Sequence, residues 1–323
     1  MLNLRSFFIK DSKEFLGDLT RHSIYTLFVV AMSSLVTYYL VSTVAFKKID
    51  NLITQTNNRQ GAPGSLNSNE SLYVERGSPY DNRTLEGSTP SANVIFHGPR
   101  DKPKIALTFD AEMTDGMKAD LVSGKVKSSY NEEIINILNK TQTKATLFLT
   151  GLWIELYPDV TNTLSQNPLF ELGSHSYTDT SYYGFCYGLK QLPNTVKVED
   201  IGATEKLLRE KAGIDNRLFR FPGGCYTPQD VKLVNQANDT VVHWDVSGAD
   251  GFNKNTSQIV HNVTDNVQNG SIIILHMNGT PTAPKTAEAL PTIISTLKAK
   301  GFEFVKVSEL LGMPPAPPNT LGR

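Results

Sequence analysis

Short apolar runs of β-type residues recur along the C-terminal two-thirds of the chain, and amphipathic stretches lie between several of them. The apolar runs occupy residues 105–110, 145–151, 170–176, 218–224, 241–248, 271–277 and 302–307. The amphipathic stretches are clearest at residues 130–141, 198–213 and 286–301. Apolar strands that alternate with helices are typical of a mainly parallel sheet covered by helices. We therefore predict an α/β fold, a distorted (β/α) barrel of about seven parallel strands.

A longer apolar stretch precedes this region. Residues 23–46 contain no charged side chain, and a helix of this length spans roughly 30 Å of hydrocarbon. A cleaved signal peptide is the main alternative, but its apolar region is only about 7–15 residues long. We therefore predict one transmembrane helix that remains as an anchor.

The anchor and the composition around it divide the chain into five parts. Residues 1–22 are predicted to be cytoplasmic, because the basic residues slightly favour that side. Residues 47–98 are rich in Asn, Ser, Gly and Pro and are predicted to form a flexible linker. A globular domain is predicted at 99–312 and a disordered tail at 313–323. The prediction is a single-pass membrane protein whose domain lies outside the cytoplasm.

Charge and cysteine content narrow the classes of function. The chain has 31 basic and 32 acidic residues, so no net positive field favours nucleic acid as a partner. Two cysteines are too few for a disulfide scaffold or a zinc site of the CxxC type. Cys186 and Cys225 both follow predicted strands, so they either form a disulfide or lie apart as two buried thiols.

Polar residues follow five of the predicted strands. In an α/β barrel the C-terminal strand ends meet at one face, where catalytic residues are usually found. One buried His or Asp is commonly structural, but five such strand ends indicate a site of titratable groups. The residues are Asp110, His175, Asp179, Arg220, Asp245, Asp250 and His276.

Five motifs in this region resemble those of a known family. They are LTFDAEMTDG (107–116), GSHSYTD (173–179), RFPGG (220–224), WDVSGADG (244–251) and SIIILHM (271–277). In this order they resemble the polysaccharide deacetylases with a NodB homology domain, carbohydrate esterase family 4. The resemblance covers about residues 101–311.

The resemblance implies metal-dependent hydrolysis of N-acetyl groups on a polysaccharide. By position, Asp110 resembles the general base and Arg220 its counter-charge. His276 resembles the general acid that protonates the departing amine, and Asp250 the residue that orients it. Ile274 takes the place of the apolar residue that lines the acetate pocket.

The metal motif departs from the family pattern. His175 resembles a metal ligand, but the family's metal-binding aspartate is Ala111 here and its second histidine is Asp179. The implied cofactor is one divalent cation, with zinc preferred and manganese or magnesium as alternatives. The missing third protein ligand is expected, in order of preference, to be Asp110, Glu112 or Asp115.

Substrate recognition is expected to use aromatic side chains near the motifs. The substrate would be peptidoglycan or a chitin-like polymer, and peptidoglycan is preferred because a tether keeps the domain near a cell wall. The losses at positions 111 and 179 leave an alternative, a catalytically inactive polysaccharide-binding module on the same fold. The aromatic candidates are Tyr177, Tyr226 and Trp244, with Tyr182, Tyr183 and Tyr187 nearby.

Overall fold

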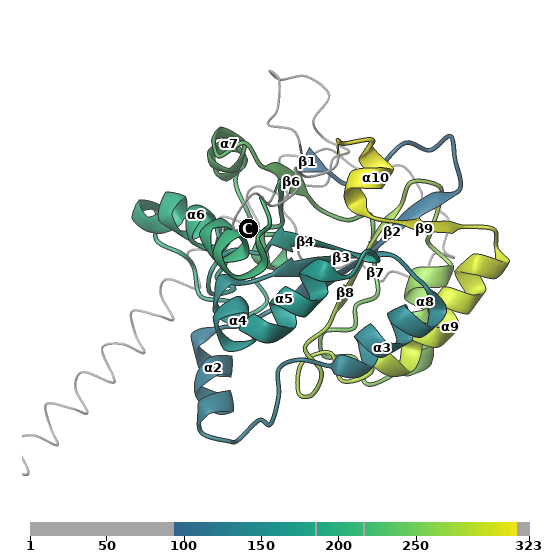
Figure 1. Cartoon of the computed structure of the whole chain (residues 1–323), viewed down its shortest axis with the longest axis horizontal. Coiled ribbons are helices and arrows are strands. Elements are labelled where there is room, and N and C mark those ends of the chain that lie inside the picture. The colour runs from purple at the N-terminus through teal and green to yellow at the C-terminus, as the bar shows by residue number, and fades with distance from the viewer. Residues whose placement is uncertain (1–93, 185, 216, 315–323) are drawn as a thin grey trace, which may run out of the picture. The chain divides into compact units, whose positions relative to one another are not determined.

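A computed structural model describes residues 94–184, 186–215 and 217–314 (Figure 1). The predicted cytoplasmic segment 1–22, the anchor 23–46 and the linker up to residue 93 lie outside the described residues, as does the tail from residue 315. Among the residues described, no helix is both long enough and apolar enough to cross a bilayer.

The core of the domain is a parallel sheet, as predicted. Every pairing between its named strands is parallel, in the order β1-β6-β5-β4-β3-β2-β8-β7, and β9 pairs with β2. Each of the seven predicted apolar runs contains a strand. The strands are β1 (Val94–Ile95), β2 (Lys104–Ala111), β3 (Ala145–Leu149), β4 (Phe170–Ser174), β5 (Leu218–Phe219), β6 (Thr240–Val242), β7 (Val246–Ser247), β8 (Ile272–His276) and β9 (Glu303–Val305).

The predicted strand at 241–248 is two short strands in the structure. β6 pairs with β5, whereas β7, only four residues further along the chain, pairs with β8 at the other end of the sheet. One continuous segment therefore connects two distant strands, and the sheet must curl to allow this. The result is the distorted barrel-like arrangement that the sequence predicts.

Helices cover the outside of the sheet. The predicted helical stretches correspond to α3 (Glu132–Thr141), α6 (Lys197–Leu207) and α9 (Thr286–Ala299). In Figure 1, α3 and α9 lie together with α8, whereas α4, α5 and α6 form a second group. The remaining α-helices of the described residues are α2 (Asp115–Val122), α4 (Gly151–Leu156), α5 (Pro158–Gln166), α7 (Pro228–Gln236), α8 (Thr256–Thr264) and α10 (Val307–Leu311).

Alternation along β2 decides which side chains reach the interior of the barrel. Leu107 and Phe109 are fully buried in the cluster formed with α3 and α9. Successive side chains of a strand point to opposite faces, so Thr108 and Asp110 point to the other face. The alternation that places apolar side chains on the outer face of β2 therefore places the Asp110 carboxylate on the inner face.

One strand of the sheet lies N-terminal to the predicted domain boundary at residue 99. β1 lies before residue 99, within the predicted linker, and pairs with β6 through Val94 and Ile95. A strand of two residues is too short to show an apolar period, so its position depends on this pairing alone. At the other end, α10 ends at Leu311 and is capped by Gly312, which has a left-handed conformation.

Candidate active site

A buried ion pair connects two of the predicted site residues. Asp110 lies at the end of β2, and Arg220 follows β5; Arg220 Nη1 donates to Asp110 Oδ1 at 2.7 Å. Arg220 is fully buried, and it also donates to Thr108 Oγ1 and to the carbonyls of Val242 and His243. Burial opposes ionisation of Asp110, but Arg220, His175 and His276 together hold the pKa of its carboxyl below the usual value. Asp110 is therefore an ionised carboxylate at neutral pH.

A second pair joins His276 and Asp250. Asp250 Oδ1 lies 2.8 Å from His276 Nδ1, and Asp250 Oδ2 accepts the backbone N–H of His276 at 2.9 Å. The ionised carboxylate of Asp250 can only accept a hydrogen bond, so Nδ1 of His276 carries a proton. The other ring nitrogen, Nε2, is left to face the cleft that His276 lines. Burial would lower the pKa of His276, but Asp250 and Glu112 raise it well above its ordinary value. His276 is thus held in the protonated form that a general acid needs.

Three side chains form a set that could hold a cation. Ligand atoms of Glu112, His175 and Asp179 all lie within 4.8 Å of one another. His175 Nδ1 lies 2.9 Å from the carbonyl oxygen of Arg220. A carbonyl oxygen can only accept a hydrogen bond, so Nδ1 carries the ring hydrogen. The other ring nitrogen, Nε2, therefore presents its lone pair to the set. Asp115, by contrast, is exposed in the first turn of α2 and does not belong to this set.

The charges around this set fit a cation. His175 Nε2 and Asp179 Oδ1 are buried and have no hydrogen-bond partner among the described residues. Nε2 lies 3.5 Å from Asp110 Oδ2 and 3.9 Å from Asp179 Oδ1, an arrangement of acceptors that repel one another. Burial and the carboxylates of Glu112 and Asp110 raise the pKa of Asp179 well above its ordinary value. A divalent ion would satisfy these acceptors, so the residues fit the implied metal.

A cleft of about 380 Å³ opens over these groups. Asp110, Glu112 and His276 line it together with Ile274, which is 4% exposed, and Trp244. The cleft therefore brings Asp110, Glu112 and His276 together beside an apolar wall within one space, as catalytic pockets do.

Two aromatic candidates do not line this cleft. Tyr177 donates through its hydroxyl to Glu155 Oε1 at 2.9 Å, and Tyr226 stacks on Phe221 within a buried aromatic cluster. Neither is among the residues around the opening. Asp245 is also absent from the residues that line the cleft. Its carboxylate forms an ion pair of 2.7 Å with Arg100.

The structure also decides between the two alternatives for the cysteines. Cys186 and Cys225 form a disulfide, with their Cα atoms 6.2 Å apart. The bond joins the loop after β4 to the loop that follows Arg220.

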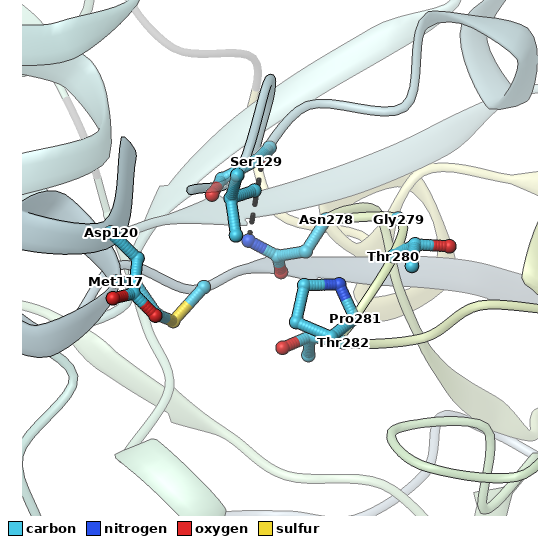
Figure 2. Close-up of a pocket in the computed structure, with 9 residues that line it drawn as sticks. Met117, Asp120, Ser129, Asn278, Gly279, Thr280, Pro281 and Thr282 are labelled. Carbon is cyan, nitrogen blue, oxygen red and sulfur yellow. Dashed lines mark hydrogen bonds between the residues drawn. The ribbon is translucent and has the colours of Figure 1, made fainter. Parts of the chain in front are cut away.

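Several supporting residues carry no signal in the sequence. Asn278 accepts the backbone N–H of Glu112 at 3.1 Å and donates to its carbonyl at 2.6 Å, which orients the loop after β2. Figure 2 shows Asn278 also donating to the carbonyl of Ser129, beside a pocket of about 30 Å³ that has room for little more than one or two waters. Thr286 donates to Asp250 Oδ2. Their roles depend on chain segments that meet only in the folded protein.

Comparison with known proteins identifies similar sequences. Residues 97–242 match the family model for polysaccharide deacetylase. A peptidoglycan-N-acetylglucosamine deacetylase of Bacillus cereus is 28% identical over 221 residues, which cover 67% of this chain and 70% of that protein. A second B. cereus protein of the same name is 28% identical over 224 residues and is covered to 94%.

Solved structures resemble the fold. The crystal structure of the Bc1960 peptidoglycan N-acetylglucosamine deacetylase has a TM-score of 0.59 and 25% identity, covering 69% of this chain and 94% of that one. A Bacillus anthracis structure described as a pseudoenzyme of carbohydrate esterase family 4 has a TM-score of 0.56 and 23% identity, covering 68% and 69%. The latter supports the fold alone.

Proposed function

Because this chain belongs to the polysaccharide deacetylase family, we propose that it hydrolyses N-acetyl groups of a polysaccharide outside the cytoplasmic membrane, with peptidoglycan as the substrate. The observation that carries the proposal is one cleft lined by both Asp110 and His276, with the set of Glu112, His175 and Asp179 beside them. The names of the B. cereus relatives support peptidoglycan as the polymer.

The chain's own residues supply the proton transfers. Hydrolysis breaks the amide C–N bond, adds water and yields acetate and a free amine. Asp110, ionised beside Arg220, accepts a proton from the attacking water. His276, protonated and oriented by Asp250, donates a proton to the departing amine nitrogen. Ile274 provides an apolar surface for the acetyl methyl group.

Glu112, His175 and Asp179 would hold the cation. When bound, a divalent ion polarises the carbonyl and lowers the pKa of water from about 15.7 towards 7. One imidazole and two carboxylates form a harder set than two histidines with one carboxylate. We propose zinc as the ion, with manganese or magnesium as alternatives that this set would accept.

The proposed location rests on two features. The uncharged stretch 23–46, outside the described residues, is proposed as the membrane anchor with residues 1–22 in the cytoplasm. The disulfide supports an extracytoplasmic domain, because disulfides persist in oxidising compartments. Protease added to intact spheroplasts should then degrade the domain and spare an N-terminal tag.

A second candidate function is a binding module without activity. Ala111 is fully buried and has no ligand atom to offer a cation in place of the family's aspartate. A module of this kind would bind N-acetylated oligosaccharide and release no acetate.

The deciding experiment measures metal content and acetate release together. The purified chain should retain about one divalent ion and release acetate from N-acetylglucosamine oligomers. Glu112→Ala and Asp179→Ala should lose both, because each removes one of three protein ligands. Asp179→His should keep both, and the exposed control Asp115→Asn should match the wild-type chain. A chain that releases acetate after complete chelation would contradict the metal assignment, and one that holds the ion but releases no acetate would support the binding module.

A further inference from the structure

The loop after β4 carries two of the three candidate cation ligands on an unusual backbone. His175 directly follows β4, and Asp179 lies four residues further along the chain. Ser176 and Asp179 both have a left-handed backbone, with φ of 63° and 50°, a conformation that is uncommon for residues other than glycine. Such a conformation persists only where the surrounding structure holds it. The contacts that hold this loop therefore decide where its two ligand side chains lie.

His175 and Asp179 differ in how they are held. The backbone N–H of His175 donates to the carbonyl of Leu149 on β3 at 2.9 Å, and its ring contacts the carbonyl of Arg220. Asp179 is also buried, but its Oδ1 atom has no hydrogen-bond partner in the part of the chain that the structure describes. The position of Asp179 therefore depends on the backbone on its two sides.

Helix α6 holds the loop on the N-terminal side of this aspartate. Thr204 Oγ1 donates to the carbonyl of Ser176 at 2.7 Å. The backbone N–H of Tyr177 lies 3.3 Å from each carboxylate oxygen of Asp200. The carbonyl of Ser176 also accepts the N–H of Gly151 at 3.0 Å, and a Cβ atom at Gly151 would lie only 2.3 Å from the Tyr177 ring. This part of the loop is thus held between α4 and α6.

The same face of α6 holds the loop on the C-terminal side. Tyr182 is fully buried, and its hydroxyl donates to Asp200 Oδ2 at 2.6 Å. The carbonyl of Tyr182 accepts a hydrogen bond from Lys197 Nζ at 2.8 Å, and Lys197 also donates to Asp230 of α7 at 2.7 Å. Lys197, Asp200 and Thr204 lie at helical spacings of three and four residues, so they share one face of α6. One helix face therefore holds the loop on both sides of the buried ligand.

We propose that Asp200 is a positioning residue for the cation ligands, because its single carboxylate holds the loop both before and after Asp179. This inference rests on the proposed function and adds how its cation set is kept in place. The set is then preorganised before a cation arrives and is not assembled by it. A buried polar network can also serve the stability of the fold alone. The two roles differ in what a change at Asp200 does to metal affinity.

The test titrates the metal-free chain with Zn²⁺ in a calorimeter. Asp200→Ala should weaken binding about tenfold, at the low end for an outer-shell partner, because Asp200 contacts the loop and not the ligand atoms. A variant that is less stable but still folded would keep the wild-type affinity if the network served stability alone. Glu199→Ala is the matched control, since Glu199 lies in the same first turn of α6 but is exposed. It should bind Zn²⁺ as the wild-type chain does.

A milder variant covers the case in which Asp200→Ala does not fold. Tyr182→Phe keeps the buried ring and removes only the hydroxyl that donates to Asp200. It should weaken Zn²⁺ binding about threefold, as expected for one lost hydrogen bond, whereas Tyr183→Phe, at a tyrosine that is 45% exposed, should not. Wild-type affinity in a folded Asp200→Ala, or in Tyr182→Phe where Asp200→Ala does not fold, overturns the proposal. An equal loss in Glu199→Ala also overturns it.

Hydrogen exchange of the metal-free chain separates this inference from the proposed function. The amides of Gly151 and Ser181 report on the loop without touching Asp200, because they donate to the carbonyls of Ser176 and Lys190. Asp200→Ala should raise their exchange rates at least tenfold and leave those of β2 and β8 unchanged. If no chain binds Zn²⁺ but this local change occurs, the positioning role stands and the cation assignment fails. If Asp200→Ala binds Zn²⁺ as tightly as the wild-type chain, the cation assignment stands and the positioning role fails.

Discussion

Replacing Arg220 with methionine should reveal how strongly the barrel interior depends on one ion pair. Arg220 is fully buried, and its guanidinium lies 4.0 Å from the centre of the Phe148 ring and 2.7 Å from Asp110. Asp110 itself is only 2% exposed. Methionine fills much of the volume but leaves this carboxylate buried without a counter-charge. Removing one partner of a buried pair costs about 3–5 kcal/mol, and we expect about 4 kcal/mol at pH 7.5.

The cost should depend on pH in a defined direction. In the wild-type chain the pKa of Asp110 is lowered, so this group stabilises the fold above its unfolded value of about 3.9, and the stabilisation is lost as the pH falls through the folded pKa. Without Arg220, burial remains and should raise the pKa of Asp110. Stability is then greatest where Asp110 is protonated and is lost as the pH rises. The difference between variant and wild type should therefore be larger at pH 7.5 than at pH 5.

Urea unfolding followed by tryptophan fluorescence measures this difference, with a chelator present so that no cation compensates for the missing charge. Arg217→Met is the matched control, because that arginine is exposed and pairs with Asp215 at 3.1 Å on the surface. It should cost less than about 1 kcal/mol. Adding Asp110→Asn to Arg220→Met should recover part of the loss. A cost below about 1 kcal/mol for Arg220→Met, or an equal cost at both pH values, would refute the reasoning.

Other predictions concern the acid, the disulfide and a buried carboxyl pair. His276→Ala should lower kcat by about 10²–10⁴ without changing the metal content, and activity within a few-fold of wild type would exclude it as the acid. Thiol titration of the unreduced, denatured chain should find no free thiol. Because the disulfide spans a separation of 39 residues, replacing Cys186 and Cys225 with serine should cost about 4 kcal/mol in the chain-entropy model, as urea unfolding would measure. Burial and the hydrogen bond and charge of Glu205 raise the pKa of Asp239 to about 9, so wild-type stability should fall as the pH rises from about 4 to 9. Asp239→Asn should flatten this slope and raise Tm at pH 8; an unchanged slope would contradict the assignment.

Much of the fold and of the chemistry follows from local pattern. Parallel strands that are buried on both faces are apolar throughout, so the seven strand-forming runs could be recognised without knowing which strands they pair with. Chain order also decides that Asp110, Arg220 and His276 follow strands, and parallel strands bring their C-terminal ends to one face. That Asp110, Arg220 and His276 meet at one face could therefore be predicted from sequence. In the structure Arg220 pairs with Asp110, and Asp110 and His276 line one cleft.

The sequence could not predict which residues of neighbouring loops lie close to one another. Glu112 and Asp115 both follow β2, but only Glu112 joins His175 and Asp179, because Thr114 caps α2 and directs Asp115 into its exposed first turn. β1 was missed for a similar reason, since two residues carry no period and only their pairing with β6 makes them a strand. The disulfide and the positions of Tyr177 and Tyr226 away from the cleft depend on contacts between segments far apart in the chain. Such contacts form only when the sheet curls, so tertiary structure alone decides them.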